Sequence, residues 1–171
     1  MGGIHASAYP DRVAQHPDID YLIQGEGEFS FPAFLSQLNE KVPDWKQVPG
    51  LVYKASDEQL VKNPMEFVDD LDQIAWPDFD AINLERYLEN GYRYKTNAQR
   101  NAPIWVTRGC PYRCTFCSAP AINGKPVRKH SVQYMTRFIR YLYEEKGIRW
   151  LSIIDDNFTF HVRYTKEYLR R

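Results

Sequence analysis

The chain has 171 residues, and its 22 Lys or Arg residues balance its 22 Asp or Glu residues, so the formal net charge at pH 7 is zero. This balance gives no electrostatic reason to expect nucleic acid as a main partner. Hydrophobic residues make up 43% of the chain and aromatic residues 15%, which is typical of a folded globular protein and not of a disordered one. No run of about 18 apolar residues occurs, so the sequence predicts no membrane span.

Two glycine-containing segments lie near the N-terminus. Gly2-Gly3 follows the first methionine, and residues 19–23 predict a strand that runs into the segment Gly25-Glu26-Gly27-Glu28. Residues 29–38 predict the helix that follows, with Pro32 tolerated because it would lie in the first turn. Glycines at a strand-to-helix turn let the backbone approach a ligand closely, and a helix N-terminus favours an anion such as phosphate. Simple tight-turn geometry is the alternative explanation of these glycines.

Residues 43–100 predict a connecting region with little regular structure. Two short apolar runs, residues 50–54 and 59–62, are separated by a polar Ala-Ser-Asp-Glu stretch and predict a small β-hairpin. Prolines and acidic residues follow, and residues 80–87 predict a short helix. Packing at a domain junction is the expected role of this region, and we predict no functional site in it.

A strand, a helix and a second strand are predicted after this linker. Residues 103–107 form a short apolar run with β-branched residues, which predicts a strand that leads into the cysteines. Ser131 is a good helix N-cap, and apolar residues recur after it at spacings of three and four as far as Leu142. Gly147 marks the end of this helix, and residues 150–154 predict a buried strand. Such a β-α-β unit has parallel strands, and its ligands bind at the carboxyl ends of those strands.

The three cysteines of the chain lie in one eight-residue run, Cys110-Pro-Tyr-Arg-Cys114-Thr-Phe-Cys117. This spacing places three thiols on one loop, close enough to hold a single metal centre. Disulfides need an even number of cysteines and a secretory context, so they do not explain the run. Iron–sulfur clusters are normally held by four thiolates, and three ligands would leave one iron open for a group that is not protein. An incomplete ligand set is typical of a catalytic metal centre.

Two adjacent carboxylates, Asp155 and Asp156, come directly after the second predicted strand. Like charges repel and burial raises the pKa of a carboxyl group, so such a pair is costly at a strand end unless it binds something. The pair therefore predicts a functional role at the same edge as the cysteine loop. A solvated turn that caps a helix beginning near His161 is the alternative, and it stays open.

The cysteine run, with an aromatic residue before its last cysteine, resembles the cluster loop of radical S-adenosylmethionine (radical SAM) enzymes. The resemblance implies that Cys110, Cys114 and Cys117 hold a 4Fe–4S cluster whose open iron is chelated by S-adenosylmethionine (SAM). It also implies reductive cleavage of SAM to a 5′-deoxyadenosyl radical, which abstracts hydrogen from a substrate. The cofactors that follow from the resemblance are the cluster and SAM.

The same resemblance implies which residues meet SAM. Phe116 is expected to lie against the adenine. Asp155 or Asp156 is expected near the SAM amino group, with no basis in the sequence for choosing between them. The glycine-rich acidic motif that is common at this place in the family is replaced here by Asp-Asp-Asn.

The first 28 residues resemble the back half of a cobalamin-binding Rossmann-like domain, which precedes the radical SAM barrel in a large class of enzymes. The resemblance is carried by Gly-Gly-x-His-x-Ser and by Gly-Glu-Gly-Glu after the predicted strand. The residues that it implies for the nucleotide tail of cobalamin are Gly2, Gly3, Gly25, Glu26 and Gly27. The front half, with its Asp-x-His-x-x-Gly motif, is absent from this sequence, so His5 does not match a cobalt ligand. Cobalamin as a third cofactor, with methyl transfer as its chemistry, therefore stays open beside a vestigial domain that does not bind it.

The expected fold class is α/β: the C-terminal part of a Rossmann-like cobalamin-binding domain, then the first β-α-β unit of a radical SAM partial TIM barrel. The expected boundaries are residues 1–42 for the first part, 43–100 for the linker and 101–171 for the truncated barrel. A barrel of this kind needs about 200 residues or more. Turnover is therefore not expected from these residues alone.

A zinc-binding module is the alternative from a different functional class. Cys110, Cys114, Cys117 and His130 would make a closed Cys3His set, although His130 lies thirteen residues beyond the last cysteine. The radical SAM interpretation implies a small-molecule substrate and an electron donor of the flavodoxin or ferredoxin type. Reduced thiols and an oxygen-sensitive cluster imply a cytoplasmic protein.

Overall fold

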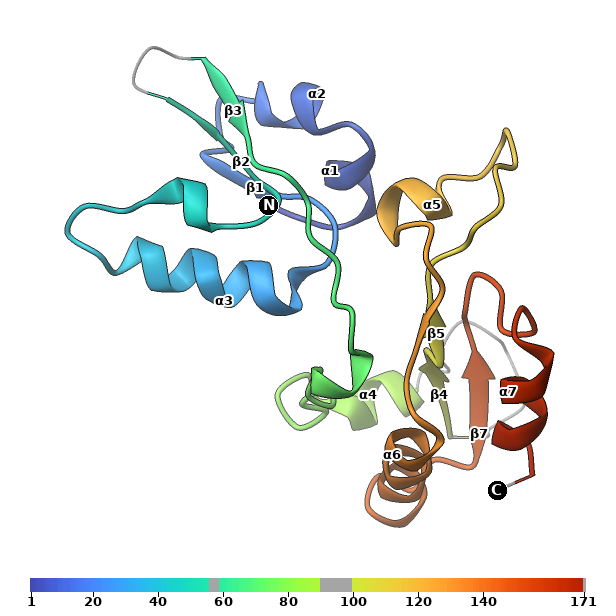
Figure 1. Ribbon diagram of the computed structural model, residues 1–171. Helices are drawn as coiled ribbons and strands as arrows, with labels where there is room; N and C mark the ends of the chain where they lie inside the picture. Colours follow the sequence, from blue (N-terminus) through green and yellow to red (C-terminus); the bar gives the residue numbers. More distant parts are fainter. Residues whose placement is uncertain (56–58, 90–99, 171) are drawn as a thin grey trace. The chain divides into compact units, whose positions relative to one another are not determined.

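The computed structural model describes residues 1–55, 59–89 and 100–170, and Figure 1 shows the chain from its N-terminus in blue to its C-terminus in red. The chain divides into two compact units. The first consists of Met1–Asp69 with Gly109–Pro126, and the second consists of Asp70–Arg108 with Val127–Arg171. The predicted boundaries at residues 42 and 100 stay a prediction.

The first unit has a three-stranded antiparallel sheet of order β1-β2-β3, with β1 at Tyr21–Ile23, β2 at Leu51–Lys54 and β3 at Leu60–Lys62. Leu22 lies opposite Val52 in this register, and both are fully buried. The helices of this unit are α1 (Ile4–Ala8), α2 (Pro10–Ala14), α3 (Gly27–Leu38), the 3-10 helix η1 (Trp45–Gln47) and α5 (Ala119–Ile122). Ala6, Val13 and Ala14 of α1 and α2 complete its core, which explains the apolar faces of two such short helices.

The predicted hairpin is confirmed as β2 and β3, and residues 56–58 of its turn lie outside the described residues. The hairpin also pairs with β1, and no pattern in the sequence predicts this pairing. The prediction for Pro32 was wrong in detail. Helix α3 begins at Gly27, two residues earlier than predicted, so Pro32 lies in the second turn and removes one intrahelical hydrogen bond there.

The second unit is built on a parallel pair, β4 (Asn101–Ile104) and β7 (Trp150–Ile153), with Ile104 opposite Ile153. A short antiparallel pair, β5 (Thr107–Arg108) and β6 (Arg128–Lys129), continues from β4. The other elements are the 3-10 helix η2 (Leu71–Gln73), α4 (Leu84–Glu89), α6 (Val132–Glu144) and α7 (Val162–Tyr168). The predicted parallel β-α-β unit is thereby confirmed, and so is the mixed α/β class. The single strand predicted over residues 103–107 is instead two strands, because the pairing partner changes from β7 to β6.

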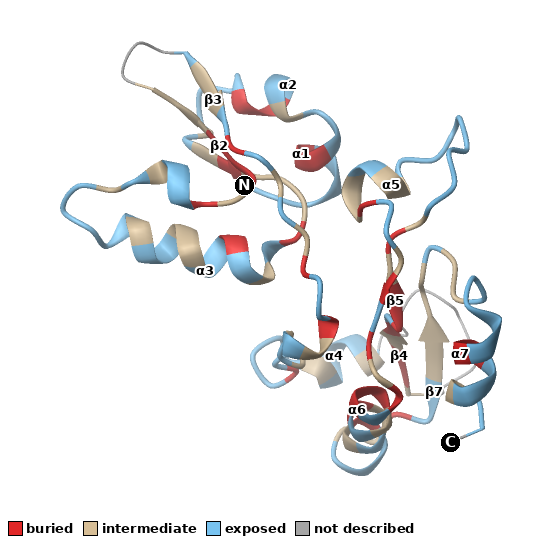
Figure 2. Cartoon of the chain, viewed as in Figure 1, coloured by how far each residue is buried: buried red, intermediate tan, exposed pale blue. Residues whose placement is uncertain are grey.

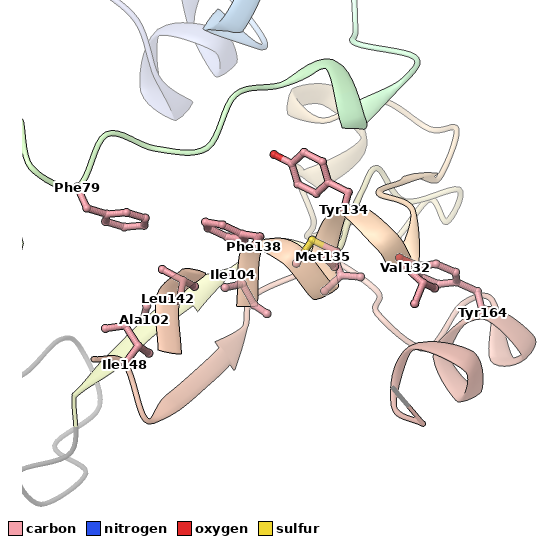
Figure 3. Close-up of a cluster of buried hydrophobic side chains, with 11 residues drawn as sticks. Phe79, Ala102, Ile104, Val132, Tyr134, Met135, Phe138, Leu142, Ile148 and Tyr164 are labelled. Carbon is pink, nitrogen blue, oxygen red and sulfur yellow. The ribbon is translucent and has the colours of Figure 1, made fainter. Parts of the chain in front are cut away.

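Helix α6 begins and ends where the sequence predicted. The Ser131 hydroxyl accepts the backbone N–H of Tyr134 at 3.0 Å, and Gly147 has a φ of +63°, which favours glycine. The buried face of α6 packs on β4 and on Phe79, as Figure 3 shows, while its other face is exposed in Figure 2. Met135 and Leu142 have no exposed surface at all. This core fixes β4 and β7 and therefore the strand ends that carry the candidate site. Among the described residues, no helix has the length and apolar character needed to cross a membrane.

Candidate functional site

The two glycine-containing segments of the first unit meet at one pocket. The pocket has a volume of about 580 Å³, within the range usual for small-molecule sites. Its lining residues are Met1, Gly2, Gly3, Ile23, Gly25, Gly27, Glu28 and Phe31. The Met1 amino group donates to the Tyr21 carbonyl at 2.7 Å and the Met1 carbonyl accepts from Ile23 N–H at 2.8 Å, as in a parallel strand pair. This pairing brings Gly2-Gly3 beside the turn that follows β1.

Four of the five residues predicted for the cobalamin tail line this pocket, and Glu26 does not. Glu26 is buried, and its carboxylate accepts the Val68 backbone N–H at 2.8 Å. The neighbouring Glu28 lines the pocket in its place. The reason is the extended backbone of Glu26 at the N-cap position of α3, which turns alternate side chains to opposite sides.

Ser7 joins the two segments, a role that the sequence did not predict. Its hydroxyl donates to the Gly3 carbonyl at 3.0 Å and accepts the Gly25 N–H at 2.9 Å. The spacing of four residues between Gly3 and Ser7 is the one sequence signal for the first of these bonds, because a serine hydroxyl can donate to the carbonyl one helical turn before it. The bond to Gly25 crosses eighteen residues and has no local signature.

The cysteine loop has a tight neck at residues 109–110 and 124–126. The Cys110 N–H donates to the Gly124 carbonyl at 3.1 Å. Gly109 has a φ of +93°, and a Cβ on it would lie 2.2 Å from the Pro126 carbonyl oxygen, so only glycine fits. Helix α5, which follows the last cysteine, lies against α1 in the same unit. The neck therefore holds the loop as a defined element.

The three thiols project from this loop and take part in no disulfide. Cys110 is half-buried, whereas Cys114 and Cys117 are exposed, and the Cys117 N–H donates to the Cys114 carbonyl at 3.1 Å. Within residues 1–55, 59–89 and 100–170, no three His, Cys, Asp or Glu side chains are close enough together to hold a metal ion. Soft thiol donors on one short loop nevertheless fit an iron–sulfur cluster in number and in chemistry, provided that the metal draws the sulfurs together when it binds.

Phe116, the residue predicted to meet adenine, is the most exposed aromatic residue among the described ones, at 92%. Its neighbours from residue 111 to residue 118 are exposed as well. Phe116 is therefore accessible to a ligand, and its contact with SAM stays a prediction.

Asp155 and Asp156 occupy different environments at the carboxyl end of β7. The Asp155 carboxylate accepts the Val106 N–H at 2.7 Å with Oδ1, and the Thr107 N–H and Thr107 hydroxyl, each at 2.8 Å, with Oδ2. Burial raises the pKa of Asp155 above the usual 3.8, the three hydrogen bonds oppose this rise, and the nearby charge of Asp156 adds to it. Asp156 is exposed. The adjacent residues thus have separate surroundings, which their sequence could not reveal.

His130, the fourth ligand of the zinc alternative, is buried in the second unit with 6% of its surface exposed. Its ring stacks on Tyr134 with centroids 4.2 Å apart, and its Nδ1 lies 3.3 Å from Asp72 Oδ1. Burial lowers the pKa of His130 below the usual 6.5, although Asp72 opposes this shift. These contacts favour a packing role for His130 over a role as a zinc ligand.

Comparison with known proteins identifies relatives along nearly the whole chain. An uncharacterized methyltransferase of Pyrococcus horikoshii is 30% identical over 162 residues, which is 94% of this chain and 34% of that protein. The cytidylyl-2-hydroxyethylphosphonate methyltransferase of Streptomyces wedmorensis is 28% identical over 99% of this chain and 36% of its own length. The anaerobic magnesium-protoporphyrin IX monomethyl ester cyclase of Rubrivivax gelatinosus is 27% identical over 100% of this chain and 31% of its own length. The chain thus spans about a third of each relative. No family model matches it.

Two solved structures share the fold. The radical SAM methyltransferase TsrM from Kitasatospora setae, with its tryptophan substrate and a SAM analogue bound, superimposes with a TM-score of 0.75. It is 23% identical, over 99% of this chain and 32% of that one. The cobalamin-dependent radical SAM enzyme OxsB, with aqua-cobalamin and SAM bound, superimposes with a TM-score of 0.72 at 20% identity, over 92% of this chain and 21% of that one.

Proposed function

Because this chain is related to the cobalamin-dependent radical SAM methyltransferases and cyclases, we propose that the full-length protein carrying it is a radical SAM enzyme. Its reaction would be hydrogen abstraction from an unactivated carbon of a small-molecule substrate, with methyl transfer where cobalamin is also bound. The observation that carries the proposal is the closed cysteine loop. It offers three free thiols and no fourth, in a chain whose relatives are methyltransferases and cyclases.

Cys110, Cys114 and Cys117 would hold a 4Fe–4S cluster. When bound, such a cluster supplies the electron that cleaves SAM to methionine and the 5′-deoxyadenosyl radical. The role of this chain would be to hold the loop in place. The neck of the loop is closed by the hydrogen bond from the Cys110 N–H to the Gly124 carbonyl and by the tight approach of Gly109 to Pro126. Exposure of the other two thiols leaves room for SAM and for an electron donor of the flavodoxin or ferredoxin type to approach.

SAM would be oriented by Phe116 and by one carboxylate at the end of β7. The exposed ring of Phe116 can cover an adenine, since aromatic faces stack on any base. A carboxylate can accept hydrogen bonds from the SAM ammonium group and pair with its charge. Phe116 would thereby meet the adenine of SAM, and the carboxylate would meet its amino group.

The pocket between the two glycine segments would receive the nucleotide tail of cobalamin. Backbone N–H groups at the start of α3 and the open space beside Gly3 and Gly27 suit a phosphate-containing group that must approach the backbone closely. The pocket would therefore suit the phosphate group in its shape and in its N–H donors. The carboxylate of Glu28, which also lines the pocket, would have to turn away from the phosphate. A radical SAM enzyme whose first domain does not bind cobalamin remains the second candidate.

The decisive experiment is anaerobic reconstitution of the full-length protein with iron and sulfide, followed by electron paramagnetic resonance (EPR) after reduction, with and without SAM. A four-iron cluster whose signal shifts when SAM is added would support the proposal. Cys114→Ser is expected to abolish the signal, whereas Ser118→Ala, exposed on the same loop, is expected to keep it. Stoichiometric zinc without iron in a folded sample would contradict the proposal and leave the zinc-binding module.

Cobalamin binding is tested separately. Gly27→Leu places a side chain in the pocket without backbone strain, because Gly27 has an ordinary φ and nothing lies within 4 Å of a Cβ there. We expect this variant to lose cobalamin affinity by about tenfold or more while the EPR signal of the cluster is kept. A wild-type protein that holds the cluster but no cobalamin would favour the second candidate.

A further inference from the structure

We propose that Cys114 and Cys117 form a redox-modification site, at which a low-molecular-weight disulfide oxidises the two thiols to one intramolecular disulfide. The site lies entirely within the cysteine loop of the first unit. Cys110, the third cysteine of this loop, stays a free thiol in the reaction. The disulfide follows from the geometry of the loop, and only its consequence for cluster binding rests on the proposed function.

Cys114 and Cys117 are the first and last residues of a β-turn. The Cys117 N–H donates to the Cys114 carbonyl at 3.1 Å, and residues 115 and 116 form the turn between them. A β-turn keeps its first and last α carbons within about 7 Å, and a disulfide needs α carbons that are about 4–7 Å apart. The backbone therefore already holds this pair at a separation that a disulfide allows.

Cys110 is placed differently. Residues 110–114 show neither a turn nor a bend, and a chain that does not turn back advances by about 3 Å per residue. Its α carbon is thus further from that of Cys114 than the about 7 Å that a disulfide spans. The Cys110 N–H is bonded to the Gly124 carbonyl in the neck of the loop, and the residue is half-buried. Among the described residues no three potential metal-ligand side chains lie close together, which fits a close pair with Cys110 apart from it.

Both thiols of the pair are accessible to a small oxidant. Cys114 and Cys117 are exposed, as are all residues from 111 to 118. One thiol attacks the sulfur of an oxidant such as glutathione disulfide and forms a mixed disulfide, while one glutathione leaves. The second thiol then displaces the other glutathione. Two protein thiols thereby become one disulfide, and glutathione disulfide becomes two glutathione molecules, which take up the two thiol protons.

The disulfide would remove two of the three sulfur ligands of the proposed cluster. The thiolate is the form of cysteine that binds a metal, and a disulfide sulfur is no longer a thiolate. The oxidised loop would therefore take up no cluster until a thiol reductant restores it. Meanwhile the pair would be protected from irreversible oxidation to sulfinic acid. In the loaded protein both thiols are ligands, and the oxidant cannot reach them.

The test treats the metal-free full-length protein anaerobically with glutathione disulfide, alkylates the remaining thiols and maps the tryptic peptides by mass spectrometry. Trypsin separates residues 109–113, which carry Cys110, from residues 114–128, which carry the pair, since Lys125 precedes a proline and is not cleaved. We expect the peptide of residues 114–128 to be lighter by two hydrogens and to carry no alkyl group, and Cys110 to be alkylated. After treatment with dithiothreitol, the same peptide should carry two alkyl groups.

Three comparisons decide whether the turn selects the pair. Cys110→Ser should form the disulfide as the wild type does, whereas Cys117→Ser should end as a mixed disulfide of Cys114 with glutathione. The wild type unfolded in urea should give a mixture of pairings that includes Cys110. The proposal is overturned if the folded protein gives that same mixture, or if the peptide of residues 114–128 stays fully alkylated.

The proposed function has a separate outcome. Protein that is first reconstituted anaerobically with iron and sulfide should not form this disulfide when glutathione disulfide is added. If it is oxidised as readily as the metal-free protein, the assignment of a cluster to these thiols fails. A disulfide in the metal-free protein would still establish the modification site in that case.

Discussion

The hydroxyl of Ser7 accepts the backbone N–H of Gly25 at 2.9 Å and so connects the turn after β1 to the first helix of the chain. The same hydroxyl donates to the Gly3 carbonyl, which also accepts the Ser7 N–H. Gly3 and Gly25 both have positive φ angles, of 93° and 74°. One buried serine thus ties together two glycine turns that line the same pocket.

Ser7→Ala is expected to destabilise the first unit and its pocket together. The substitution leaves the partly buried Gly25 N–H without its acceptor, and the loss of such a hydrogen bond costs about 0.5–1.5 kcal/mol. Urea denaturation should show the loss, and cobalamin titration should show weaker binding. Ser36→Ala, at an exposed position of α3, is the matched control and should change neither quantity. Equal stability of the two variants would contradict the connecting role of Ser7.

Gly109→Ala is expected to open the neck of the cysteine loop. A residue with a Cβ is strained by about 1–2 kcal/mol at a positive φ, and here the Cβ would also collide with the Pro126 carbonyl oxygen. Iron content after anaerobic reconstitution should fall well below that of the wild type. Lys125→Ala, exposed on the same loop, should reconstitute normally. Normal iron content in Gly109→Ala would show that the neck does not determine cluster binding.

Met135→Ala is expected to destabilise the second unit by about 2–5 kcal/mol, since it removes a fully buried side chain and leaves a cavity beneath α6. Met135→Leu keeps the volume and should cost less than about 1.5 kcal/mol. Gln133→Ala on the exposed face of α6 should change stability by less than about 0.5 kcal/mol. Urea denaturation monitored by circular dichroism measures all three. A small effect of Met135→Ala would mean that this face of α6 is not the core of the unit.

The free energy of unfolding should decrease as the pH falls, because His130 takes up a proton more readily in the unfolded chain than in the folded one. Burial lowers the pKa of His130 in the folded state below the usual 6.5, so the neutral ring is favoured by folding. Its contribution is fully present above pH 6.5 and is lost as the pH falls from 6.5 through the lowered pKa. The pKa of Asp72 is also lowered. Burial opposes this shift, but the hydrogen bonds from Ser131 outweigh the effect of burial. The contribution of Asp72 to the free energy of unfolding is therefore lost only below pH 3.8.

The measurement is the free energy of unfolding between pH 5 and pH 8 for the wild type and His130→Gln. The variant should lose the decrease that the wild type shows below pH 6.5. His16→Gln, which removes an exposed histidine, should keep it. An unchanged pH profile in His130→Gln would assign the acid sensitivity to another group.

The β-α-β unit could be predicted from the sequence because its signals are local. The serine N-cap, the apolar spacing of three and four and the terminal glycine each act within a few residues of α6, and all three recur in the structure. The pairing of β1 with the hairpin could not be predicted, since β1 and β2 lie about thirty residues apart and short apolar strands fit several partners. The division of residues 103–107 between β4 and β5 could not be predicted either, because it depends on pairing with two strands that lie further along the chain.

The sequence by itself determined the three thiols of the candidate site. Cys110, Cys114 and Cys117 lie within eight consecutive residues, so they stay on one short segment in any fold. It also identified the glycine turns, since a positive φ restricts which residue can stand there. Only the tertiary structure decided which way Glu26 and Asp155 face and that Ser7 joins two turns. Those contacts join residues 18 to 49 positions apart, and they depend on strand register and burial, which no local pattern encodes.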